Sequence, residues 1–117
     1  MAADLGVTHL FAGCAVADIA TARAFYERLF GREPDLVPND REACWQVGED
    51  TWVYAVVDLA RAGGGISTIL VADLDALVAD WATRGIAPVE VRAEGPDARK
   101  ARILDPDGNE LGFAQVG

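Results

Sequence analysis

"GVTHLFAGCAVADIATARAFYERLFGREP", residues 6–34, contains the signals that decide the fold. An apolar, strand-like run comes first and is followed by Asp18, a residue type that commonly caps a helix N-terminus. Beyond Asp18, apolar side chains recur at the spacing of an amphipathic helix, and Gly31 is suited to end that helix. The apolar positions are Ile19, Ala22, Phe25, Tyr26, Leu29 and Phe30. The stretch therefore predicts a strand followed by a capped helix.

A second stretch, "GGISTILVADLDALVADWATRGIAP" (residues 64–88), repeats this plan. Asp73 is the predicted cap and Gly85 the predicted stop. The predicted caps of the two stretches lie 55 positions apart and the predicted stops lie 54 positions apart, so the offset between the two stretches is nearly constant. The apolar face of this second helix would consist of Leu74, Leu77, Val78 and Trp81. We interpret the two stretches as an internal duplication.

Short extended runs follow each predicted helix, as expected for strands separated by turns. They cover residues 35–38, 42–47 and 51–59 in the first half, and 87–93, 101–104 and 110–116 in the second. Each half then reads βαβββ. The 117-residue chain is predicted to be one α+β domain, made of modules 6–59 and 66–117 joined by the linker 60–65, "ARAGGG". The linker is interpreted as a flexible joint.

The predicted modules would leave one sheet face uncovered. A helix covers only one face of a four-stranded sheet, so two such modules are expected to form a curved mixed sheet around a concave cavity. That cavity is the candidate binding site.

Composition restricts the partners. Nineteen acidic and ten basic side chains give a formal net charge of −9, which disfavours nucleic acid and anionic membranes because both would be repelled. Cys14 and Cys44 lie far apart in apolar stretches, so buried free thiols are expected rather than a disulfide framework. No apolar run approaches the length of a membrane span, and a cytoplasmic location is the default expectation.

Three quoted features carry a resemblance: "FYERLFG" in the first helix, "ADLDAL" before the second, and "DPDGNELGF" (residues 105–113) near the end. In this order the chain resembles the vicinal oxygen chelate superfamily, which includes glyoxalase I, extradiol dioxygenases and bleomycin-resistance proteins. The resemblance covers nearly the whole chain and implies the glyoxalase/bleomycin-resistance fold. It does not fix the activity, because one fold can host many functions.

In the metal-dependent members, the resemblance implies His, Glu or Gln ligands at four strand positions. Here those positions fall on Phe11, Ser67 and Gly112, with Trp52 or Tyr54 as the fourth. None of these is a good ligand for a divalent cation, because Gly and Phe supply no lone pairs. No metal and no cofactor are therefore expected.

His9 and Glu110 are the nearby alternatives. His9 lies two residues before Phe11, and a shift of register would make it a ligand, but it lacks partners at the other positions. A local hydrogen bond or a place at the pocket mouth is favoured. Glu110 follows a turn, where a solvated strand start is the favoured interpretation.

Aromatic side chains gather near the predicted cavity and would suit a planar ligand. The predicted ligand-binding set is His9, Phe11, Trp45, Trp52, Tyr54, Ser67 and Gly112. Two function classes stay open. One is a metal-free binding protein of the drug-resistance type, which sequesters an aromatic or cationic small molecule. The other is a glyoxalase-like lyase, isomerase or dioxygenase with an unrecognised metal site. The resemblance also implies a homodimer.

Overall fold

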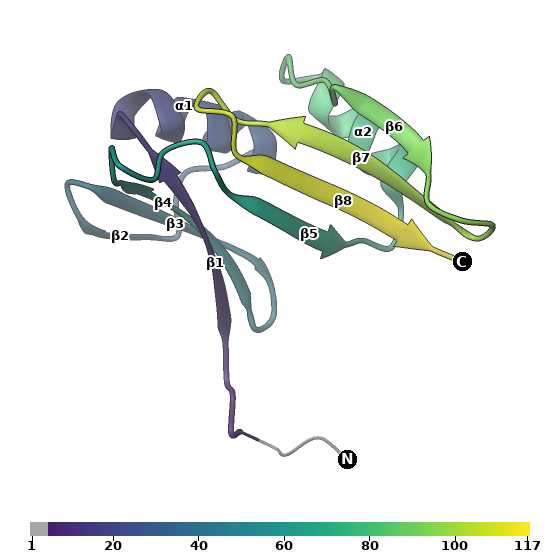
Figure 1. Ribbon diagram of the computed structural model, residues 1–117, viewed down its shortest axis with the longest axis horizontal. Helices are drawn as coiled ribbons and strands as arrows, with labels where there is room; N and C mark the ends of the chain where they lie inside the picture. Colours follow the sequence, from purple (N-terminus) through teal and green to yellow (C-terminus); the bar gives the residue numbers. More distant parts are fainter. Residues whose placement is uncertain (1–4) are drawn as a thin grey trace.

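The computed structural model describes residues 5–117, and these form two successive βαβββ modules (Figure 1). The first module contains β1 (Leu10–Val16), α1 (Ile19–Phe30), β2 (Leu36–Asn39), β3 (Glu42–Gly48) and β4 (Thr51–Val57). The second contains β5 (Ile66–Leu70), α2 (Leu74–Ala82), β6 (Glu90–Ala93), β7 (Ala98–Leu104) and β8 (Glu110–Val116). The predicted α+β class and the repeated element order are confirmed.

Both helices begin at the predicted caps. A carboxylate oxygen of Asp18 accepts a hydrogen bond from the N–H of Thr21 at 2.8 Å, and Asp73 accepts one from Ala76 at 3.0 Å. Each bond satisfies one of the amide donors that a helix start leaves without an intrahelical partner. The duplicated Asp is thus a duplicated cap.

The two helix ends differ from one another. Gly31 follows α1 in the left-handed conformation, with φ 74°, as predicted. The stop predicted at Gly85 is wrong by two residues, because α2 ends at Ala82 and Thr83 is its C-cap. A turn follows, and Gly85 adopts its positive φ of 77° there. The Thr83 hydroxyl donates to the carbonyl of Asp80, one of the carbonyls that a helix end leaves without a partner one turn ahead.

Each module has its own four-stranded sheet, in the order β1-β4-β3-β2 and β5-β8-β7-β6. The first strand of each module runs parallel to the last, and the other neighbours are antiparallel. The sheets lie side by side and diverge, with β1 and β5 on the sides that face the other module (Figure 1). The mixed surface therefore consists of two separate sheets rather than one continuous hydrogen-bonded sheet.

One apolar core connects the modules on the helix-covered faces of the sheets. Phe25 and Leu29 of α1 and Trp81 of α2 are buried, and Leu77 packs against the core at partial exposure. These are helix positions whose spacing predicted a face toward the sheets. Within residues 5–117, no helix is both long enough and apolar enough to span a membrane.

A buried cluster of hydrogen-bonded residues, which we call the module clasp, holds the two modules together. It consists of Ala15, Tyr26, Gly65, Asp105 and Asn109. The Tyr26 hydroxyl donates to Asp105 at 2.7 Å, and the Asn109 amide donates to Asp105 and to the Ala15 carbonyl at 2.8 and 2.7 Å. The amide oxygen of Asn109 accepts from the N–H of Gly65 at 2.8 Å. The DPDGN turn of the second module is thereby bonded to β1, α1 and the linker.

The glycine-rich linker fits closely against the same turn. Gly63 has φ +89°, and a Cβ built on it would lie 2.3 Å from the Asp107 carbonyl oxygen. No L side chain fits there without a backbone shift. The predicted flexible joint is therefore wrong: at Gly63, glycine is required by a positive φ and by close packing.

Candidate functional site

Three aromatic side chains lie together on the uncovered face of the first sheet. Phe11 on β1 is the register partner of Trp52 on β4, and their rings stack with centroids 5.2 Å apart at 16°. Tyr54 is two residues further along β4 and meets Phe11 edge-on at 6.3 Å. Phe11 is 45% exposed although it is a large apolar residue. The group presents an aromatic surface that residues 5–117 leave uncovered.

The indole N–H of Trp52 is buried and has no hydrogen-bond partner within residues 5–117. Nearly all buried polar groups in proteins have such a partner. Leaving this donor unpaired costs about 1–3 kcal/mol. An oxygen acceptor from outside the described chain would remove that cost.

Two hollows flank Tyr54 on this face. The smaller measures about 270 Å³ and has mostly apolar walls, with one carboxylate, that of Glu42. Among residues 5–117 this carboxylate forms no ion pair and accepts one hydrogen bond, from the Asn39 amide at 3.1 Å. The residues around it are Phe11, Leu36, Pro38, Glu42, Cys44 and Tyr54. The combination suits a ligand with an apolar ring and a positive charge.

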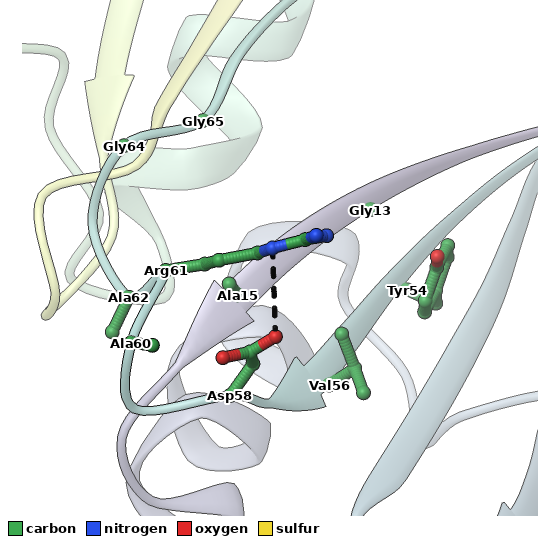
Figure 2. A pocket seen from close by; sticks show the side chains of 10 residues that line it. All are labelled: Gly13, Ala15, Tyr54, Val56, Asp58, Ala60, Arg61, Ala62, Gly64 and Gly65. Carbon is green, nitrogen blue, oxygen red and sulfur yellow. Dashed lines mark ion pairs between the residues drawn. The ribbon is translucent and has the colours of Figure 1, made fainter.

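The larger hollow, of about 620 Å³, lies between Tyr54 and the linker (Figure 2). Gly13 forms part of its floor, and a Cβ there would lie 2.8 Å from the Tyr54 ring. Arg61 extends from the linker over β1, with its Nε 3.8 Å from Asp58 (Figure 2). Both groups of this ion pair are exposed, so each can also bind a ligand group.

Trp45 does not belong to this face. It pairs with Val53 and is completely buried under α1, where its ring contacts Tyr26 at 5.7 Å. Its indole N–H donates to the Arg32 carbonyl at 3.0 Å. The prediction that Trp45 lines the cavity is therefore wrong, because it is a core residue.

Ser67 is also placed on the other face. It is the register partner of the buried Leu111, whereas its neighbour Thr68 is the partner of Gly112. Side chains of successive strand residues point to opposite faces. Thr68, rather than Ser67, shares the uncovered face with Gly112, so the prediction for Ser67 was one residue out of register.

Gly112 lies under the side chain of Lys100. A Cβ built on Gly112 would lie 2.2 Å from the Lys100 Cε and 3.1 Å from its Nζ. Any longer side chain at position 112 would displace this lysine. The position that the resemblance assigns to a ligating carboxylate is thus covered by a cationic side chain.

His9 and Glu110 have local partners. His9 precedes β1, is exposed, and its Nδ1 lies 3.1 Å from the Thr8 hydroxyl. The Arg102 guanidinium donates two hydrogen bonds to Glu110, at 2.8 and 2.9 Å, and these lower the pKa of that carboxyl. Cys14 and Cys44 are buried free thiols, as predicted, and burial raises the pKa of both.

Comparison with solved structures identifies the family. A crystal structure of a glyoxalase / bleomycin resistance protein from Catenulispora acidiphila DSM 44928 is 38% identical to the chain, covering 93% of this chain and 98% of that one, with a TM-score of 0.89. The chain belongs to the glyoxalase / bleomycin resistance protein family. This membership agrees with the resemblance to the vicinal oxygen chelate superfamily.

More distant structures of the same fold include two binding proteins. A bleomycin-binding protein from Streptomyces verticillus, complexed with copper(II)-bleomycin, is 22% identical and has a TM-score of 0.71, covering 100% of this chain and 99% of that one. An antibiotic binding protein from Streptomyces sp. CB03234 is 24% identical and has a TM-score of 0.74, covering 97% of this chain and 100% of that one. At these identities the likeness shows the fold alone. No family model matches the sequence, and no curated protein does either.

The resemblance implies that the family includes metal-dependent members, but the residues that the structure describes do not fit a metal ion. Within residues 5–117 no group of three or more His, Cys, Asp or Glu side chains could hold one. The uncovered faces instead carry Phe11, Trp52 and the Lys100 chain over Gly112. An ammonium group close to the expected ligand position would repel a divalent cation.

Proposed function

We propose that this family member is a metal-free binding protein that sequesters an aromatic or cationic small molecule, as drug-resistance proteins do. The observation that carries the proposal is the Phe11–Trp52 pair with its unpartnered indole N–H. A planar ligand would stack on the exposed part of these rings, and a small shift of the Trp52 ring would bring its buried N–H to an oxygen or nitrogen acceptor on the ligand.

Charge supports the cationic part of the proposal. The Glu42 carboxylate lies at the smaller hollow, and the whole chain carries a formal charge of −9. Long-range attraction of this kind mainly increases the association rate and weakens as salt is added. Apolar burial and stacking on Phe11, Trp52 and Tyr54 would supply the affinity itself.

The printed functions of two structural neighbours point the same way. One binds bleomycin and the other an antibiotic. They share the fold of this chain, and we extend small-molecule binding to this chain as part of the proposal.

Bleomycin and ethidium, a planar aromatic cation, are suitable probes, with choline as a cation that cannot stack in the same way. We expect tryptophan fluorescence and calorimetry to show binding of at least one aromatic probe. Trp52→Leu should weaken it about tenfold or more, because a base-sized stacking contact contributes about 1–3 kcal/mol. Trp52→Phe keeps an aromatic ring but lacks the N–H, so it should bind with intermediate affinity. Equal affinities for all three proteins would contradict the proposal.

The alternative function is a glyoxalase-like metal-dependent lyase, isomerase or dioxygenase. It is tested by metal analysis after incubation with zinc, nickel, iron(II) or manganese, followed by a glyoxalase assay. We expect no stoichiometric metal, and no effect of a chelator on the binding of ethidium, which does not itself bind metal. Bound metal together with turnover would replace the proposed binder by an enzyme, and His9 would be the first ligand to test.

A homodimer is the predicted assembly. Among the strands of residues 5–117, β1 pairs only with β4 and β5 only with β8, so each sheet has a free edge. Large apolar side chains are exposed on these edge strands, with Leu10 at 64%, Ile66 at 77% and Leu70 at 69% exposure. Uncovered edges and apolar patches of this kind favour association of identical chains.

Light scattering at micromolar concentration should give about twice the chain mass of 12.4 kDa. Ile66→Lys, which places a charge on the exposed edge, should shift the protein toward the monomer without loss of secondary structure. A wild-type mass of one chain would rule out the dimer.

A further inference from the structure

A cavity of about 210 Å³ lies at the junction of the two modules, on the helix-covered side of the sheets. Its first wall comes from the end of α1 and the end of β3. Its second wall comes from β5, α2 and β8. None of its lining residues belongs to the hollows that flank Tyr54. It is therefore separate from the proposed open-face site.

The body of this junction cavity is apolar. Phe30 and Val47 line it from the first module, and Ile69, Val71 and Leu77 line it from the second. All five side chains pack against the core but are only partly buried, because they face the cavity. An apolar cavity of about 150 Å³ is sufficient to bind a benzene ring. The junction cavity is larger than that and has walls that suit one ring.

Two arginines belong to the lining, together with one carboxylate, that of Asp80. Arg84 donates through Nε to the Arg28 carbonyl and through Nη2 to Asp80 at 2.8 Å. Arg32 donates through Nη2 to Asp35 at 3.0 Å. Arginine has five N–H donors. No hydrogen bond within residues 5–117 uses Nη1 of Arg84, or Nε and Nη1 of Arg32, so each guanidinium retains donors for a further acceptor.

We propose that the junction cavity is a second ligand site, for a small aromatic carboxylic acid. The ring would fill the apolar space between the modules, and the carboxylate would accept hydrogen bonds from the free donors of Arg32 and Arg84. Each arginine could donate from a free N–H to one oxygen of the carboxylate, and hydrogen bonds between ionised groups are stronger than neutral ones. Because the walls belong to both modules, the bound acid would contact both and stabilise their arrangement.

Benzoate is the probe, and benzyl alcohol, which has the ring but no charge, is its matched comparison. Calorimetry should show benzoate binding, and in ¹⁵N spectra the indole peak of Trp81, which lines the cavity, should move while that of Trp52 stays. Ile69→Phe fills the cavity and should weaken benzoate binding about tenfold or more. Arg32→Gln should weaken benzoate but leave benzyl alcohol unchanged.

Val47→Phe fills the cavity from the other module and replaces Ile69→Phe if that variant does not fold. The proposal is overturned if wild type shows no benzoate binding up to about 10 mM, a limit that corresponds to less than about 3 kcal/mol. It is equally overturned if the filled variants bind like wild type, or if Trp52 responds instead of Trp81. Failure of bleomycin or ethidium to bind has no bearing on it, because those probes test the open face.

Discussion

Trp81→Ala is expected to lower the free energy of unfolding by about 3–5 kcal/mol, the usual cost of removing a large aromatic side chain from a core. Trp81 is 1% exposed on the inner face of α2, and its ring meets Phe113 of β8 edge-on at 4.9 Å. The truncation removes this contact, the burial of the indole, and a packing link between α2 and its sheet. Urea unfolding followed by far-UV circular dichroism measures the change.

The matched control is Trp52→Ala, on the uncovered face of the first sheet. Trp52 is only partly buried and carries an unpaired N–H, so its loss should cost about 1 kcal/mol or less. A change below 1 kcal/mol for Trp81→Ala would mean that α2 does not pack as described. Similar losses in the free energy of unfolding for both variants would contradict the assignment of Trp81 to the core and of Trp52 to the uncovered face.

The sequence predicts the helices because their signals are local. Asp18, Asp73 and Gly31 act within one helical turn, and apolar spacing alone indicates which side of each helix packs on a sheet. The last strand and its turn are also local, and β8 spans Glu110–Val116 as predicted. These features need no knowledge of distant partners.

The faces of the strands depend on distant pairing and were harder to predict. Trp45 lies on the strand next to Trp52, but the register makes Gln46 the partner of Trp52 and the buried Val53 the partner of Trp45, so being on a neighbouring strand does not decide the face. Nothing in the spacing around Ser67 shows that Thr68 is the partner of Gly112. Phe11 and Trp52 could be predicted because the resemblance assigns ligand positions to them, and the register places the two residues side by side.

The conformation of the linker was also hard to predict from the sequence. A run of glycines is ambiguous between flexibility and close fit, and only the approach of Asp107 to Gly63 decides it. The larger hollow depends on this fit, since Ala15 and Gly65 both line it and both bond to Asn109. The DPDGN turn therefore supports the shape of the open-face site as well as the contact between modules.

Asp105→Ala should lower the free energy of unfolding by about 3–5 kcal/mol, because several buried donors would lose their acceptor at about 1–3 kcal/mol each. Asp105 is 5% exposed and accepts from the Tyr26 hydroxyl and the Asn109 amide, and from the backbone N–H groups of Asp107 and Asn109. Burial raises the pKa of Tyr26, so its hydroxyl stays protonated and donates. Alanine would leave these donors without their acceptor inside the protein, where each unpaired group is costly.

Two further variants distinguish the hydrogen bonds of the module clasp from the effect of the backbone shape of the DPDGN turn on stability. Tyr26→Phe removes one donor and leaves Asp105 bonded by the others, so it should cost about 1–2 kcal/mol. Asp107→Ala removes a more exposed carboxylate of the same turn, whose bond to the Ala17 N–H measures 3.2 Å, and should cost about 1 kcal/mol or less. We expect urea unfolding to show the largest loss in the free energy of unfolding for Asp105→Ala, a smaller loss for Tyr26→Phe and the smallest for Asp107→Ala. Equal losses at Asp105 and Asp107 would mean that the turn acts only through its backbone shape, because the buried carboxylate would then contribute no more than the exposed one.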